Sequence, residues 1–170
     1  GADRTVRIWD YGNRACLLVK QVAEDPLCLS LHPSGDLVVV GFADKLRLYS
    51  VLLDDLRLVA GFAAKGVREV CFSHGGGTIA AVTGSHIHLF DAFSHAALGL
   101  LRGHTGLVWR VAWSADDASL VSCGHDGAIY LWDVATRQRV VQSDHVCKAE
   151  QYEAVVVAPT TREGGIPLVA

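Results

Sequence analysis

The chain has 170 residues, of which 51% are hydrophobic and 19% charged, and its formal net charge is −3. This composition suits a globular protein with a sizeable core and excludes a disordered tail. Lys and Arg are scattered singly among Asp and Glu, which argues against a nucleic-acid interface. Unbroken apolar stretches such as Leu37–Val40 have the length of a strand, far short of the ~20 residues of a membrane-spanning helix.

An aromatic residue recurs along the chain at an almost constant interval. Trp9 is followed by Tyr49, Phe90 and Trp132, so that successive aromatic positions lie 40, 41 and 42 residues apart. Trp9 and Trp132 are each followed by Asp. A repeat of ~40–45 residues that ends in Trp-Asp is typical of the four-stranded blades of a β-propeller.

The repeat register divides the chain into five segments, taken in order. Residues 1–21 end one blade, because Gly1–Asp10 aligns with Gly124–Asp133. Residues 142–170 begin another, because Val155–Val157 repeats the pattern of Leu29–Leu31. Three whole blades are expected in between, at residues 22–60, 61–100 and 101–141. The predicted fold is therefore all-β, a partial propeller with three whole four-stranded blades and a half-blade at each end.

Alternating apolar residues support strands within each blade. Third strands carry one apolar face, at Val6/Ile8, Leu46/Leu48, Ile87/Leu89 and Ile129/Leu131. Turn residues separate the first and second strands, at Pro33–Asp36, His74–Gly77 and Ala115–Asp117. Helical periodicity with caps is not found over any segment of 12 or more residues.

The two half-blades allow two interpretations of the ends. The chain starts at Gly1 and contains no Met, which favours an internal piece of a longer protein. Alternatively, the half-blades join and close a small four-bladed ring. The five cysteines form no CxxC pair and lie mostly in strand-like runs, which fits a reducing, intracellular compartment.

The segment Gly103–Asp133 begins with Gly-His and ends with Trp-Asp, and it resembles the WD40-repeat family. His104, Ser122 and Asp126 are also the residue types of a hydrolase triad. In the WD40 family, however, the corresponding Asp, His and Ser residues form a buried hydrogen-bond network with the Trp. The resemblance therefore implies a structural network of His104, Ser122, Asp126 and Trp132, with no hydroxyl left exposed for nucleophilic attack.

The other blades depart from this signature. Val40 and Ala81 stand at the position of Ser122, and Val22 and Ala63 stand at the position of His104. These blades are expected to rely on apolar packing.

Two further patterns suggest ligands but have simpler explanations. His86 and His88 share one face of a strand, as two metal ligands would, but no third ligand is nearby in sequence. Gly75–Gly77 joins two strands and is not followed by Lys-Ser/Thr, so a tight turn explains it better than a phosphate cradle. No catalytic residue, metal site or cofactor is expected, and the chain is not expected to be an enzyme.

Binding to other proteins is the function that a propeller rim supports. Aromatic and Arg residues dominate the energy of such surfaces. Trp109 and Arg110 follow the Gly-His turn, His125 precedes the loop Asp, and Phe42 lies in the corresponding loop of an earlier blade. These four are the candidate partner-binding residues. The alternative for Trp109 and Phe42 is that their rings pack between blades.

A narrower resemblance covers roughly Gly41–Asp133. The segments Asp44–Leu48 and Leu52–Arg57 are similar to the cilia- and flagella-associated protein 57 family of axonemal WD-repeat proteins. The resemblance implies a structural component of the motile-cilium axoneme that helps to position inner dynein arms on doublet microtubules. Its partners would be axonemal proteins and inner dynein arm components, with no nucleic acid, membrane or small-molecule substrate. The alternative is a soluble WD40 adaptor, a substrate receptor or trafficking subunit that binds peptides transiently at the rim.

Overall fold

The computed structural model describes residues 2–141, 144–147, 152–157 and 168–169. Strands make up its regular structure, and every pair of strands is antiparallel. Within these ranges no helix is long and apolar enough to cross a membrane. The expected all-β class is confirmed.

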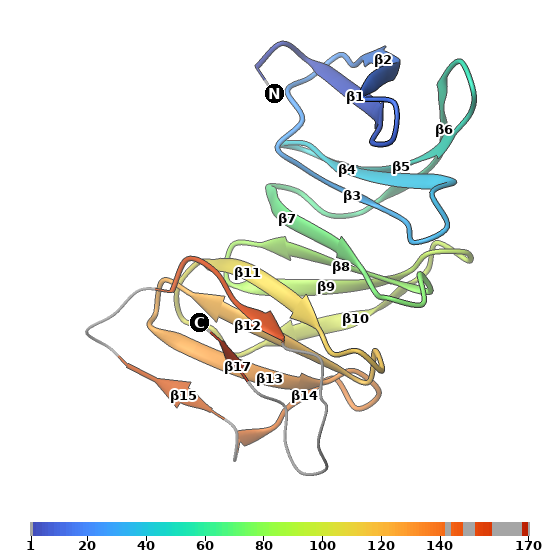
Figure 1. Cartoon of the computed structure of the whole chain (residues 1–170). Coiled ribbons are helices and arrows are strands. Elements are labelled where there is room, and N and C mark those ends of the chain that lie inside the picture. The colour runs from blue at the N-terminus through green and yellow to red at the C-terminus, as the bar shows by residue number, and fades with distance from the viewer. Residues whose placement is uncertain (1, 142–143, 148–151, 158–167, 170) are drawn as a thin grey trace.

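Two four-stranded sheets and one five-stranded sheet follow an N-terminal hairpin in chain order (Figure 1). The hairpin consists of β1 (Thr5–Asp10) and β2 (Ala15–Gln21). The first sheet contains β3 (Cys28–Leu31), β4 (Leu37–Gly41), β5 (Leu46–Val51) and β6 (Leu56–Phe62). The second contains β7 (Val67–Phe72), β8 (Thr78–Thr83), β9 (His86–Asp91) and β10 (Ala97–Arg102). The third contains β11 (Val108–Trp113), β12 (Ser119–Gly124), β13 (Ala128–Asp133) and β14 (Gln138–Arg139).

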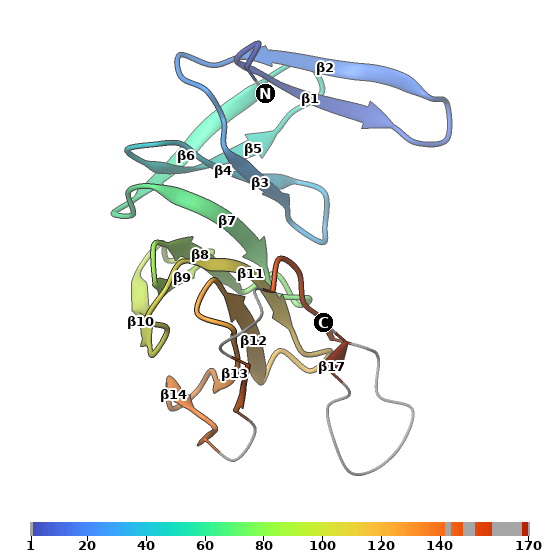
Figure 2. The same ribbon diagram turned by 90° about the vertical axis from the view of Figure 1, so that its left-hand side faces the viewer.

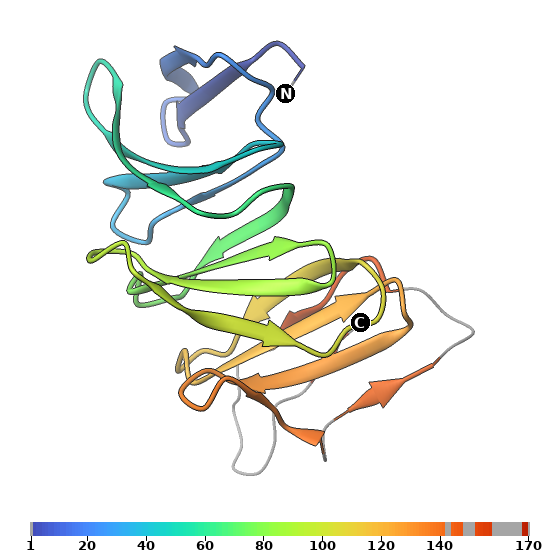
Figure 3. The same ribbon diagram turned by 180° about the vertical axis from the view of Figure 1, so that it is seen from behind.

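Successive sheets pack face to face. Their first strands, β3, β7 and β11, lie along one side of the stack, and β6, β10 and β14 lie along the other (Figure 2). The view from behind shows the same succession from the hairpin to the third sheet (Figure 3). This arrangement is that of a partial β-propeller, as the repeat pattern predicts.

The core fills the spaces between neighbouring sheets. Leu46 and Leu48 of β5 point toward the second sheet and pack with Val70 and Phe72 of β7. Tyr49, on the opposite face of β5, packs against the hairpin. A further cluster joins the second and third sheets. Because both faces of each central strand are covered, these strands contain almost continuous apolar runs.

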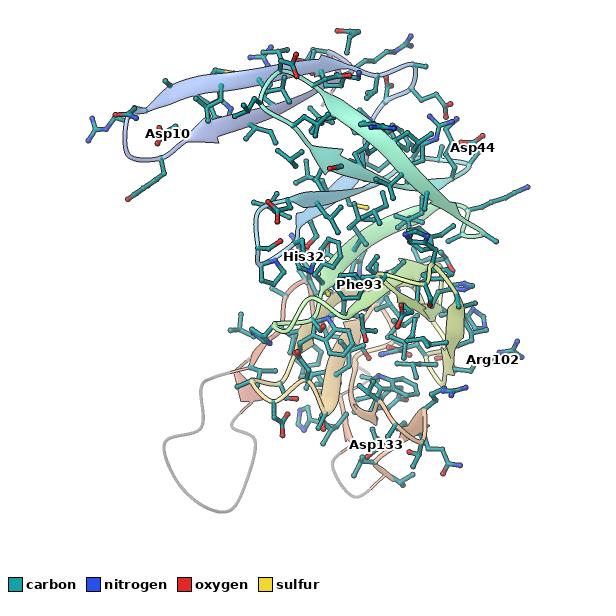
Figure 4. The ribbon with its side chains drawn as sticks, turned by 90° about the vertical axis from the view of Figure 1, so that its right-hand side faces the viewer. Asp10, His32, Asp44, Phe93, Arg102 and Asp133 are labelled. Carbon is teal, nitrogen blue, oxygen red and sulfur yellow. The ribbon has the colours of Figure 1, made fainter. Side chains whose placement is uncertain are left out.

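Turns at one end of the stack also join the blades. The imidazole of His32, in the β3–β4 turn, packs edge-on against Phe72 and Phe93 of the second sheet, with ring centroids 5.1 and 6.1 Å apart. Figure 4 shows His32 and Phe93 close together at this boundary. Asp117, in the β11–β12 turn, accepts hydrogen bonds from the backbone N–H groups of His74 and Gly75 at 2.8 and 2.6 Å. Each of these two turns therefore contacts the adjacent sheet and stabilises its position.

The expected blade boundaries need correction. β6 continues to Phe62 and β10 to Arg102, past the limits expected at residues 60 and 100, because their ladders with β5 and β9 continue to these residues. The third sheet extends past residue 141, since β15 (His145–Val146) also pairs with β13. Of the further blade expected at 142–170, β16 (Val156–Val157) and β17 (Leu168–Val169) form a short antiparallel pair. Pro159 lies outside the described residues.

Candidate functional site

The third sheet contains a buried network of four side chains. His104 precedes β11, Ser122 lies on β12, Asp126 in the β12–β13 loop and Trp132 on β13. The His104 Nδ1 atom lies 3.0 Å from both carboxylate oxygens of Asp126, and its Nε2 atom lies 2.7 Å from the Ser122 hydroxyl. The Trp132 indole donates to that hydroxyl at 2.7 Å. The structure thus brings together all four residues of the expected network.

Hydrogen-bond donors and acceptors determine the protonation of this network. An ionised Asp126 carboxylate can only accept, so the proton of a neutral His104 lies on Nδ1 and is donated to Asp126. Nε2 then accepts from the Ser122 hydroxyl, whose oxygen accepts from the Trp132 indole, a group that can only donate. The network is satisfied when the imidazole is neutral and the carboxylate is ionised.

The electrostatics favour the same protonation state. Burial lowers the pKa of His104, and the hydrogen bond and charge of Asp126 oppose this shift without reversing it. For Asp126, burial raises the pKa, but hydrogen bonds from His104 and the Thr105 N–H outweigh it, so that the pKa is lowered. Both shifts stabilise a neutral imidazole beside a charged carboxylate.

The succession of hydrogen bonds from Asp126 through His104 to Ser122 resembles a hydrolase triad, but a substrate could not reach the serine. The Ser122 side chain is 0% exposed, and its hydroxyl already makes two hydrogen bonds. A nucleophile must reach its substrate from an open site. This arrangement instead ties the segment that enters the blade to β12 and β13.

A second group of candidate residues lies on the rim where β7 and β11 begin. Trp109 is half-buried, Arg110 and His125 are exposed, and the His125 N–H donates to the Leu107 carbonyl at 2.8 Å. Trp109 is the extra residue of a β-bulge between Val108 and Arg110, which turns its side chain out of the alternating pattern. These three expected residues therefore lie close together.

Trp109 and Arg110, but not His125, line a groove of about 820 Å³ between the first strands. The Arg68 guanidinium lies over the Trp109 ring, 5.8 Å from its centroid, and Arg110 forms a 2.7 Å ion pair with Glu69. Glu69 raises the pKa of Arg110 by hydrogen bonding and charge. Leu27 and Leu29 add an exposed apolar wall. Such a mixture of aromatic, Arg and apolar groups suits a protein partner.

Comparisons with known proteins identify the family. Residues 96–133 match the family model "WD domain, G-beta repeat". The chain is 42% identical over 160 residues to cilia- and flagella-associated protein 57 of Mus musculus, in an alignment covering 94% of this chain. The chain belongs to the WD40-repeat family. It is also 38% identical over 143 residues to cilia- and flagella-associated protein 57 C of Tetrahymena thermophila, covering 76% of this chain.

A more distant WD40 relative is WD repeat-containing protein 1 of Bos taurus, 31% identical over 140 residues, covering 75% of this chain and 22% of that protein. The chain spans 13% of the length of the mouse relative and 11% of the Tetrahymena one. It therefore aligns with only one part of each of these longer proteins.

The expectation for Phe42 is wrong. Its ring is 1% exposed and packs between the first sheet and the hairpin. The physical reason lies in the WD40 network. Gly124, the last residue of β12, occupies the corresponding position of the third blade, where an added Cβ would lie 3.0 Å from Nδ1 of His104. The first blade has Val22 in place of the histidine, which leaves room for the Phe42 ring to turn inward.

Sequence reasoning missed the partners that complete the rim. Arg68 and Glu69 lie 41 residues before Trp109 and Arg110, at the corresponding positions of the preceding WD40 blade. Because first strands of successive blades lie side by side, residues one repeat apart become neighbours. The repeat interval was the signal that could have identified both pairs.

The two other sequence patterns have ordinary surroundings. His88 stacks on Phe90, with an angle of 5° between the rings, and burial, His86 and Arg102 lower its pKa. No group of three or more His, Cys, Asp or Glu in the part of the chain that the structure describes is placed to hold a metal ion. Gly75–Gly77 forms the turn between β7 and β8, with Gly76 at a φ of 76°.

Proposed function

We propose that this chain is part of a non-enzymatic WD40 scaffold of the motile-cilium axoneme, where it helps to position inner dynein arms on doublet microtubules. The observation that carries the proposal is the 42% identity, over 94% of the chain, to a mouse protein whose name associates it with cilia and flagella. The Tetrahymena relatives carry the same association in their names. The role at inner dynein arms follows from the resemblance to that family.

The shape of the molecule supports a scaffold. Stacked sheets with interlocked side chains form a rigid support, and the rim presents Trp109, Arg110 and His125 from short, well-anchored segments. His104, Ser122 and Asp126 form hydrogen bonds with one another. The exposed side chains of the rim are therefore suited to binding a partner. Axonemal proteins are the proposed partners.

Fractionation of isolated motile cilia tests the location. Detergent separates the soluble matrix from the axoneme, and the protein is measured in each fraction through its tryptic peptide Glu69–Arg102. We expect it to remain with the axoneme and to be redistributed when inner dynein arms are missing. Recovery in the soluble matrix, as a transient adaptor would show, contradicts the proposal.

Rim variants test the binding surface in the same cilia. Trp109→Ala in the full-length protein removes the central aromatic group, so we expect release from the axoneme at a lower salt concentration. Leu53→Ala is the matched control, because Leu53 is fully exposed in the turn between β5 and β6, away from the groove. Equal retention of both variants would exclude Trp109 from the binding surface.

A further inference from the structure

The rim groove contains a cation that no acidic side chain of the described residues neutralises. Arg68, on β7, is exposed, and it makes neither a hydrogen bond nor an ion pair within the described part of the chain. Arg110, the other arginine of the groove, is already paired with Glu69 at 2.7 Å. Arg68 therefore has the guanidinium that a bound partner can engage.

Stacking on Trp109 prepares Arg68 for a planar ligand. The guanidinium lies 5.8 Å from the centroid of the Trp109 ring and is attracted by its π electrons. This contact leaves the five N–H groups of the guanidinium free to donate. An arginine that is already held in place loses less freedom when it binds, so it suits a carboxylate better than an unrestrained one.

The indole of Trp109 also lacks a hydrogen-bond partner. Its N–H group is buried and has no acceptor within the described residues, although buried donors are normally paired. An ionised carboxylate offers about four lone-pair positions, so one such group can serve the guanidinium and, after a small shift of the ring, the indole. Both groups favour a ligand that accepts hydrogen bonds.

The charges of the groove favour a single carboxylate. Its lining contains two cations and two anions, Arg68, Arg110, Glu69 and Glu153. Glu153 is exposed and precedes β16, which continues the series of first strands beyond β11, so it lies on the opposite side of β11 from Arg68. A tract of several acidic residues would meet Glu153 and be repelled. A phosphate carries close to two negative charges at neutral pH, more than the one unpaired cation can neutralise.

We propose that the rim groove binds a protein segment through one carboxylate, an Asp or Glu side chain that forms a bidentate ion pair with Arg68. The inference rests on the proposed role of this rim in binding axonemal proteins, and it specifies the chemistry of the partner. Uncharged residues beside the carboxylate pack against the half-buried Trp109. An Arg anchor beside an aromatic ring is a frequent centre of binding energy in protein interfaces.

Photo-crosslinking identifies the partner segment directly. Benzoylphenylalanine replaces Leu107, an exposed residue two positions before Trp109, in the purified full-length protein. A second preparation carries it at Leu53, away from the groove. Each preparation is irradiated with salt-extracted axonemes and, separately, with the soluble matrix of cilia. The attached peptides are then sequenced by mass spectrometry.

We expect adducts at Leu107 that are absent at Leu53, and partner peptides that share an Asp or Glu among uncharged residues. Arg68→Gln should lower their yield ~10-fold, because the charge-assisted pair is lost. Arg68→Lys keeps the charge without the planar fork and should lower the yield less. Arg102→Gln, at an exposed position outside the groove, is the matched control and should leave the yield unchanged.

The place and the chemistry of the adducts answer separate questions. Adducts in the matrix instead of the axoneme contradict the proposed function, whereas an acidic segment whose capture depends on Arg68 supports the carboxylate site in either fraction. The site is overturned if the attached peptides lack Asp and Glu or contain tracts of several acidic residues. It is also overturned if Arg68→Gln lowers the yield no more than Arg102→Gln, or if Leu107 gives no adduct beyond that at Leu53. Thermal unfolding checks that Arg68→Gln is folded.

Discussion

At the scale of single residues, His104 connects two partners that need opposite hydrogen-bond roles. Its Nδ1–H donates to Asp126 and its Nε2 accepts from Ser122. No other neutral side chain of similar size offers a ring donor and a ring acceptor on opposite edges. Removing it leaves a carboxylate and a hydroxyl without their partner inside the blade.

We expect His104→Ala to lower the free energy of unfolding by ~1–3 kcal/mol, because buried partners lose their hydrogen bonds. Urea-induced unfolding of the purified protein measures this change. His125→Ala is the control, since His125 is exposed in the neighbouring loop and should change stability by less than ~0.5 kcal/mol. Equal effects of the two substitutions would contradict the structural role of the network.

The same residue predicts a dependence of stability on pH. The folded pKa of His104 is lowered from 6.5, so below that pH the unfolded chain binds a proton that the folded chain excludes. Its stabilisation is complete above pH 6.5 and is lost as the pH falls toward the folded pKa. Unfolding measured from pH 8 to 5 should show a steeper loss in the original protein than in His104→Ala, by at most ~1.4 kcal/mol per pH unit. Parallel curves would contradict this assignment.

At the scale of elements, turns as well as strands provide specific contacts between blades. Gly35 and Gly76 occupy corresponding positions of the β3–β4 and β7–β8 turns, with φ angles of 83° and 76°. Nothing lies within 4 Å of a Cβ added at Gly35, whereas one added at Gly76 would overlap the imidazole of His32. The same local conformation therefore serves two different packing roles.

We expect Gly76→Ala to destabilise the protein more than Gly35→Ala. Both substitutions cost ~1–2 kcal/mol for a non-glycine residue at positive φ, but only the first must also displace His32. The difference in Tm between the two variants isolates the contact between blades. If Gly35→Ala proves equally or more damaging, the His32 contact contributes nothing to the stacking of the sheets.

At the scale of the whole molecule, the reactivity of the cysteine thiols can show whether the blades unfold together or separately. Burial raises the pKa of Cys28 and Cys71 to about 12 and that of Cys123 to about 11, so almost no reactive thiolate forms at neutral pH. Cys16, in contrast, is exposed on the hairpin. Cys123 is buried and Cys28 and Cys71 are half-buried. All three lie on first or second strands of the sheets, where local fraying is least expected.

We expect a thiol reagent to modify Cys16 rapidly and Cys28, Cys71 and Cys123 only when the sheets separate, because the thiolate is the reacting species. Mass spectrometry of the peptides during labelling in increasing urea follows each site. If the stack unfolds cooperatively, the three slow sites should become reactive over the same urea range. Separate transitions for the three would show that the blades open one by one.

The local pattern of the amino-acid sequence determined the architecture of this protein. Alternating apolar residues, turn residues such as those at Pro33–Asp36, and the nearly constant spacing of Trp9, Tyr49, Phe90 and Trp132 predict strands, turns and blades. The His104 network was also accessible to sequence reasoning, because all of its members belong to one repeat with a recognisable signature.

Packing between repeats decided the rest. The burial of Phe42 and the Arg110–Glu69 ion pair each depend on what a neighbouring segment contributes. Residue type at one position does not reveal the volume or charge that will face it from another blade. The sequence by itself therefore determined the blades and their internal network, and only the tertiary structure decided which side chains the stacked blades bury, pair or leave free.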